Sequence, residues 1–226
     1  DRAKFSSWVG GLTNSSSPLG MLWGSRKIWT LLRYLRNQFQ LAREHPREGL
    51  ITTLVQAEQE GDRLSEDELL AMTFLLLLAG HETTVHLLTS GVWALLAHPE
   101  QKAKLMADWS HGPTMVDEIL RYAAPVLLSK PRFAKRDLEF FGQLIKKGEF
   151  VLAGLASGNF DPEKFENPET FDITRKPNQH LSFGGGIHFC LGFQLAKMEA
   201  QVAIEKLFTR YPCLLYTSDA ADETCR

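Results

Sequence analysis

Cys190 is the residue with the clearest capacity for chemistry, because it stands between a glycine-rich loop and a predicted helix. The segment from His180 to Ala200 reads HLSFGGGIHFCLGFQLAKMEA. A thiol at a helix N-terminus meets free N–H groups and the positive end of the helix dipole, which favour the thiolate. The glycines permit positive φ and a close approach of the backbone to something flat or bulky. The segment by itself allows a nucleophile with His188 as its base, a metal ligand, or an inert buried thiol.

A second candidate segment, AGHETT at residues 79–84, falls in the middle of a long predicted helix. Gly80 lowers helix stability relative to alanine, and threonine hydroxyls can bond to carbonyls four residues earlier and loosen the turn. We expect Glu82 to be a carboxylate deep in an apolar context, where it could form a proton-transfer pair with Thr83. The alternative is structural: Gly80 permits close packing and Glu82 meets a structural partner.

A third candidate is the pair Glu118 and Arg121 in the segment DEILRY. A spacing of three residues puts both side chains on one face of a helix, where they can form an ion pair. Most such pairs are exposed and contribute well under about 1 kcal/mol to stability. Taken alone, this pair therefore predicts a surface contact.

The elements that must position these residues are mostly helices. Apolar side chains recur at helical spacing in several long segments. From this pattern we expect helices over residues 29–43, 50–60, 65–97, 113–122 and 190–211. Ser65 and Glu68 form a capping-box pattern at the start of the longest helix. After Pro125, short runs of alternating apolar and charged residues predict strands, so the fold class is mainly α with a minor β-sheet.

The composition narrows the class of protein. The sequence is 44% hydrophobic and 23% charged, and its formal net charge of −2 gives no basic field for nucleic acid. Three cysteines are too few for a disulfide framework or a tetrahedral zinc site and favour a reducing cytoplasm. The densest apolar run, from Leu69, is shorter than the roughly 20 residues that span a bilayer, and the start lacks a signal-peptide pattern. We therefore expect a cytoplasmic protein without nucleic-acid or membrane partners.

In combination, the three segments resemble the cytochrome P450 family of haem-thiolate monooxygenases, most closely its soluble bacterial members. FGGGIHFCLG, residues 183–192, fits the family's cysteine-ligand loop at every fixed position. AGHETT fits its oxygen-binding helix and EILR its Glu-x-x-Arg pair, in the family's order. The resemblance covers residues 1–212 and implies the C-terminal portion of a P450 domain, truncated at the N-terminus. Residues 213–226 fit no family motif, and we expect a non-family tail of the kind that a sequencing artefact produces.

The resemblance also implies a cofactor and residue roles. The cofactor would be haem b (iron protoporphyrin IX), with Cys190 as the axial iron ligand that promotes O–O cleavage. Glu82 and Thr83 would be the acid–alcohol pair that supplies protons to dioxygen. Further haem contacts are implied for Phe183, Gly184, His188, Gly192, Arg132, Ala79 and Gly80, with Arg132 and His188 on the propionates. A buried structural triad is implied for Glu118, Arg121 and Arg175. The distal substrate pocket would be lined by Leu75, Leu78, Ala79, Val126, Leu127 and Leu128.

The implied activity is insertion of one atom of dioxygen into a hydrophobic organic substrate, by hydroxylation or epoxidation. Electrons would come from NAD(P)H through a ferredoxin or flavodoxin and its reductase. Basic residues could attract such an acidic partner or be a solvated surface: Lys130, Lys135, Arg136, Lys146 and Lys147. The alternatives are a peroxide-driven peroxygenase, against which the Glu82–Thr83 pair argues, and a non-catalytic haem-binding module. Because the family's N-terminal half is missing, we expect the fragment to bind haem poorly and to be inactive.

Overall fold

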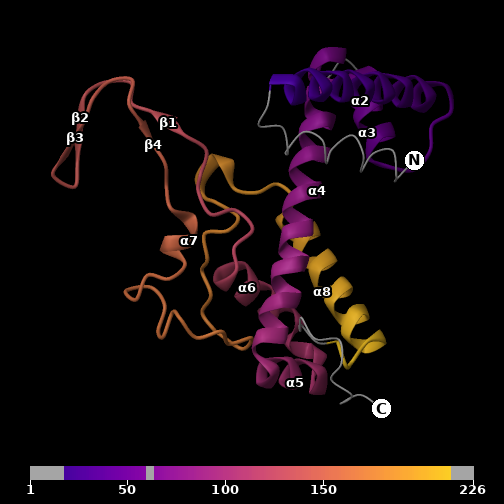
Figure 1. Cartoon of the computed structure of the whole chain (residues 1–226). Helices are drawn as coiled ribbons and strands as arrows, with labels where there is room; N and C mark the ends of the chain where they lie inside the picture. Colours follow the sequence, from indigo (N-terminus) through magenta and orange to yellow (C-terminus); the bar gives the residue numbers. More distant parts are fainter. Residues whose placement is uncertain (1–17, 60–63, 215–226) are drawn as a thin grey trace. The chain divides into compact units, whose positions relative to one another are not determined.

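The structure is a computed structural model that describes residues 18–59 and 64–214, and it is mostly helical (Figure 1). Its α-helices are α2 (Pro18–Glu44), α3 (Leu50–Gln59), α4 (Glu66–Ala97), α5 (Pro99–Ala107), α6 (Gly112–Tyr122), α7 (Leu155–Gly158) and α8 (Phe193–Arg210). Two 3₁₀ helices are η1 (Trp109–His111) and η2 (Gly186–His188). The chain divides into two compact units, residues 1–81 and 82–226, with the boundary inside α4.

In the first unit, α2, α3 and the beginning of α4 enclose a small apolar core. Its buried side chains are Leu31, Leu35, Phe39, Val55, Leu69 and Leu70. Helix α4 begins with the predicted capping box. The Glu68 carboxylate accepts a hydrogen bond from the Ser65 N–H at 2.8 Å, and the Ser65 hydroxyl accepts one from the Glu68 N–H at 3.4 Å. These reciprocal bonds satisfy two backbone donors and fix the start of the long helix.

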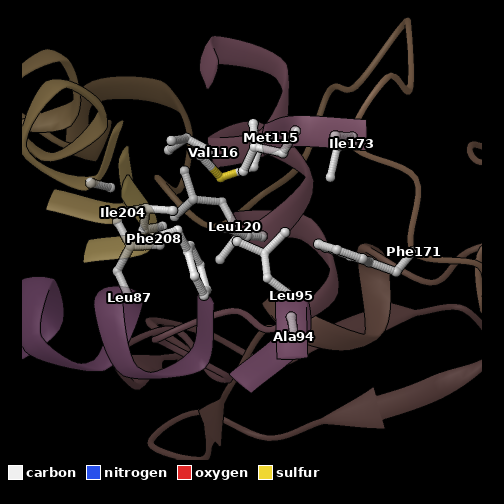
Figure 2. Close-up of a cluster of buried hydrophobic side chains, with 13 residues drawn as sticks. Leu87, Ala94, Leu95, Met115, Val116, Leu120, Phe171, Ile173, Ile204 and Phe208 are labelled. Carbon is white, nitrogen blue, oxygen red and sulfur yellow. The ribbon is translucent and has the colours of Figure 1, made fainter. Parts of the chain in front are cut away.

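In the second unit, the core forms where the C-terminal half of α4, α6, α8 and the irregular segment after residue 160 meet (Figure 2). It contains Leu87, Ala94, Leu95, Leu105, Met115, Val116, Ile119, Leu120, Phe171, Ile173, Ala200, Ile204 and Phe208. Gly91 of α4 faces this core, because a Cβ built there would lie 3.0 Å from Cδ1 of Ile119 and 3.2 Å from Cδ1 of Ile204. The glycine thus lets α4 approach α6 and α8 closely.

By length and composition alone, α4 is long and apolar enough to cross a membrane. The core helix of a globular protein meets the same two criteria. In the second unit, however, Leu87, Gly91 and Leu95 of this helix pack into the core with residues of α6 and α8. This half of α4 is therefore a core helix of a globular unit.

The β-structure consists of two small antiparallel sheets. Strand β1 (Arg132–Phe133) pairs with β4 (Phe150–Val151), and β2 (Leu138–Phe140) pairs with β3 (Gln143–Ile145). An isolated bridge joins Leu128 to Gly154. Phe141 and Gly142 have φ of 49° and 73°, which closes the β2–β3 hairpin through a two-residue turn. The sheets confirm the minor β content expected after Pro125.

Three expectations about the helices need correction. The helix predicted over residues 29–43 begins earlier, at Pro18. Helix α5 was not among the predicted helices; Pro99 occupies its first turn, where proline is favourable. The helix predicted to start at Cys190 starts at Phe193. Cys190 therefore lies in the loop before the helix.

Candidate functional site

The loop around Cys190 is held by its own backbone. The N–H of Cys190 donates to the carbonyl of Phe183 at 2.9 Å, which closes the glycine segment into a tight loop. Within it, η2 is completed by the Phe189 N–H, which donates to the Gly186 carbonyl at 3.1 Å. Gly184 and Gly186 have φ of 70° and 63°, values that residues with a side chain rarely adopt. The glycine spacing is thus required by the backbone path that presents the thiol.

The outer face of this loop is open and apolar. Ile187 is 97% exposed and Leu191 is 85% exposed. A Cβ built on Gly185, Gly186 or Gly192 would meet no atom within 4 Å. Gly192 is the N-cap of α8 and offers no side-chain hydrogen bond to it, so the first N–H groups of that helix have no side-chain cap. This surface suits a large, flat, apolar group that takes the electron-rich sulfur of Cys190 as a ligand.

The inner face of the loop is aromatic. The Phe183 ring packs against the rings of His180, Phe189 and Phe193, with centroids 5.5, 6.3 and 6.0 Å apart. Phe183 also packs against the core of the second unit. The aromatic cluster therefore joins the Cys190 loop to the packed interior.

The donor set can be tested against an iron porphyrin. In residues 18–59 and 64–214, no group of three or more His, Cys, Asp or Glu side chains could hold a metal ion. A metal bound by Cys190 would therefore have to bring most of its ligands with it, as haem iron does. The single half-buried thiol, the open glycines and the exposed apolar residues fit that group.

The side chains predicted to bind propionates lie in the same unit as Cys190. Arg132 is on β1 and His188 ends η2, and both are exposed. A planar guanidinium suits a carboxylate because it can donate two parallel hydrogen bonds. That Arg132 and His188 contact the same ligand stays a prediction.

The AGHETT segment is continuous α-helix in α4. The Glu82 side chain is 41% exposed and lies 4.0 Å from Nε2 of His86, so the expectation of a deeply buried carboxylate is wrong for this chain. A Cβ on Gly80 would meet no atom of the described residues within 4 Å, so no described side chain packs closely against this glycine. The segment is thus an open helix surface that carries an acid.

The residues predicted to line the substrate pocket are only partly buried. Leu75 of α4 is exposed and Leu78 is half-buried, and both belong to the first unit. In the second unit, Leu127 and Leu128 are exposed and Val126 is half-buried. A shared cavity between the two groups stays a prediction.

Glu118, Arg121 and Arg175 come together in a buried network. Arg121 donates to both carboxylate oxygens of Glu118, and Nε of Arg175 lies 3.1 Å from Oε2 of Glu118. Glu118 and Arg121 are completely buried, so the exposed ion pair that the spacing alone predicted is excluded. Further guanidinium N–H groups donate to backbone carbonyls of residues 159, 166, 167, 168 and 170. Every N–H group of Arg121 thus has an acceptor, which makes its buried charge tolerable.

Sequence reasoning missed Asn159, which is completely buried. Its Nδ2 donates to the carbonyl of Arg121 at 3.2 Å, and its Oδ1 accepts from the N–H of Leu181 at 2.7 Å. The residue thereby joins the end of α6 to the segment that leads into the Cys190 loop. A polar residue in a loop rich in Asn, Asp and Pro gives no sign in sequence that it will be buried.

Comparison with known proteins identifies the family. A family model described as "Cytochrome P450" matches residues 28–111 and 113–224. The chain belongs to the cytochrome P450 family. This P450 sequence is 43% identical over 217 residues to cytochrome P450 CYP107DY1 of Priestia megaterium, with 95% of this chain and 52% of the relative covered. It is 42% identical to the polyketide biosynthesis cytochrome P450 PksS of Bacillus subtilis, with 94% and 52% covered.

A solved P450 structure has the same fold. P450BioI, in complex with acyl carrier protein ligated to hexadec-9Z-enoic acid, superposes with a TM-score of 0.87 at 39% identity, over 97% of this chain and 57% of that chain. The chain thus spans about half the length of the P450 relatives that it matches. The family match runs on to residue 224, so it includes most of the segment 213–226, whose assignment as a non-family tail stays a prediction.

Proposed function

We propose that these residues are the C-terminal portion of a haem-thiolate monooxygenase that inserts one atom of dioxygen into a hydrophobic organic substrate. The observation that carries the proposal is the Cys190 loop. It presents one thiol on an open, glycine-lined apolar surface beside an uncapped helix N-terminus. Membership of the P450 family supports the same assignment.

In this proposal, haem b is held by Cys190 through its thiolate, by Phe183, Gly184 and Gly192 through close packing, and by Arg132 and His188 through the propionates. Bound haem supplies the redox-active iron at which dioxygen is activated. The uncapped N–H groups at the start of α8 favour the negative charge of the sulfur.

Glu82 and Thr83 hold and pass the protons that oxygen chemistry consumes. Glu82 is partly exposed and can exchange its proton with solvent, which suits a group at the entrance of such a path. Ala79 and Gly80 leave the adjoining helix surface free of bulky side chains. Electrons come from NAD(P)H through a ferredoxin or flavodoxin and its reductase.

The substrate is hydrophobic, in keeping with the leucines proposed to line its pocket. One relative's structure contains a fatty acyl chain on an acyl carrier protein, and another relative is named for polyketide biosynthesis. A carrier-bound acyl chain is therefore the first substrate to compare with the free acid. Leu128 is proposed to contact the substrate, so its replacement alters the ratio of products.

The first experiment tests haem ligation on the 226-residue chain. Haem is added to wild type and to Cys190→Ser, and the absorption spectrum of the reduced CO adduct is recorded. A long-wavelength Soret band typical of thiolate ligation, present in wild type and lost in Cys190→Ser, supports the proposal and also refutes the expectation that the fragment binds haem poorly. Haem uptake with the same spectrum in both proteins overturns the assignment of Cys190.

The second experiment uses the protein that includes the P450 portion absent from this chain. Product formation is compared with NAD(P)H, ferredoxin and reductase, and with peroxide alone. Turnover with peroxide but none with the electron-transfer chain would replace the monooxygenase by a peroxygenase. Substrate-induced spectral change without NAD(P)H consumption would indicate a non-catalytic haem-binding module.

A further inference from the structure

Asp117 of α6 binds both flanks of the Cys190 loop. On the C-terminal side, Nζ of Lys197 in α8 lies 2.6 Å from Oδ1 and 2.8 Å from Oδ2 of Asp117. On the N-terminal side, Nε2 of His180 lies 3.5 Å from Oδ1. His180 precedes Cys190 by ten residues and Lys197 follows it by seven, so one carboxylate brackets the loop.

The contact with His180 has a direction. The N–H of Ser182 donates a hydrogen bond to Nδ1 of His180 at 3.3 Å. In the neutral ring the proton is therefore on Nε2, and this N–H donates a hydrogen bond to Asp117. The His180 side chain is 6% exposed, and its ring packs 5.5 Å from that of Phe183. Since the Phe183 carbonyl accepts the Cys190 N–H, three successive contacts lead from Asp117 to Cys190.

The carboxylate that makes these contacts is charged. Burial alone would raise the pKa of Asp117, but the hydrogen bonds from His180 and Lys197 and the positive charge of Lys197 outweigh it and hold the pKa below its usual value. The neighbouring Glu118 bonds to Arg121, Arg175 and Asn178 instead. Two adjacent acids of α6 therefore serve separate networks.

We propose that Asp117 is a positioning residue for Cys190, which fixes the loop from both flanks through His180 and Lys197 and thereby sets the place of the sulfur. The proposal rests on the proposed function in one respect, that Cys190 is the iron ligand. A mere surface ion pair between α6 and α8 would involve Lys197 alone and would leave the loop unaffected.

The decisive measurement needs no haem. Hydrogen exchange of the Cys190 amide is followed by NMR in the 226-residue chain for wild type, Asp117→Ala and Asp117→Asn, with Glu199→Gln as a matched control on the exposed side of α8. We expect exchange roughly tenfold faster in Asp117→Ala and a smaller increase in Asp117→Asn, which keeps an acceptor for His180. Exchange at Leu95 and Leu105 in the core should stay as in wild type and the control.

Unchanged Cys190 exchange in a folded Asp117→Ala protein overturns the proposal. If that variant does not fold, Lys197→Met and His180→Phe each remove one flank, and absence of any effect of both on the Cys190 amide overturns it equally. In haem-loaded samples, Asp117→Ala should shift the reduced CO spectrum from the thiolate band toward the band of non-thiolate haem. If wild type takes up haem but lacks the thiolate band, while exchange of its Cys190 amide still changes on replacement of Asp117, the proposed haem function fails and the positioning role stands.

Discussion

Arg121 donates two hydrogen bonds to Glu118, from Nε to Oε2 at 2.9 Å and from Nη2 to Oε1 at 2.8 Å, in a place fully closed to solvent. A single buried ion pair is a weak source of stability, because desolvation offsets the attraction. Here Glu118 also accepts bonds from the Asp172 N–H and from Arg175. The network therefore binds α6 to a segment of irregular backbone and specifies where that segment lies.

The first prediction concerns this network. Glu118→Gln should lower the free energy of unfolding by about 3–5 kcal/mol, because it leaves two guanidinium groups without a buried countercharge. Urea denaturation of the 226-residue chain measures the change. Arg36→Gln is the control, since its pair with Asp67 is exposed and should contribute less than about 1 kcal/mol. Equal losses in the two variants would contradict the prediction.

The second prediction compares two glycines of α4. Gly91→Ala should destabilise the chain by roughly 1–3 kcal/mol, because the new methyl group would press on the side chains of Ile119 and Ile204, which are buried in the core. Ile119→Val removes the Cδ1 atom nearest the new methyl, so the double variant should recover part of the loss. Gly80→Ala is the control and should stabilise the helix by about 0.5–1 kcal/mol, because the site is open. Thermal melting of wild type, Gly91→Ala, the double variant and Gly80→Ala measures these changes in stability.

The third prediction is a pH dependence. Asp117 has a folded pKa below its usual value of 3.8, so it contributes stability above that value and loses it as the pH falls through the folded pKa. The difference in unfolding free energy between wild type and Asp117→Asn should therefore be largest near pH 6 and shrink toward about pH 3. Asp67→Asn, at an exposed position, should follow the wild-type profile. A constant difference at all pH values would show that the carboxylate charge is not responsible.

The fourth prediction concerns proton supply in the complete enzyme. Glu82→Gln should lower the rate of product formation by about 10²-fold, the smaller end of what a positioned acid contributes. Thr83→Ala should divert NAD(P)H consumption from product to hydrogen peroxide. Product, peroxide and NAD(P)H are measured in the same reaction. Thr89→Ala is the control, because that hydroxyl bonds to the carbonyl of Val85 within the helix and should leave the ratio unaltered.

The sequence predicted the features that depend on local chemistry. Ser65 and Glu68 form the capping box, and the long apolar run is the helix that carries AGHETT. Contacts between distant segments could not be predicted from the sequence. Nothing in DEILRY distinguishes a surface pair from a buried one, and Arg175 was added only through the family resemblance. The roles of Gly91 and Asn159 depend on neighbours more than 20 residues away. The last helix was predicted to start at Cys190, whereas the Cys190 N–H bonds to the Phe183 carbonyl in the loop. Nothing in the sequence indicates this bond.

The segment 159–178 contains little regular secondary structure, and its Asn, Asp and Pro content is that of a loop that proteases cut readily. Five of its carbonyls are nevertheless bound by the guanidinium groups of Arg121 and Arg175. A protease must draw such backbone into an extended form, which these bonds oppose. Resistance of this stretch to digestion would thus depend on Glu118, a residue some 40–60 positions away, because that acid holds both arginines in place.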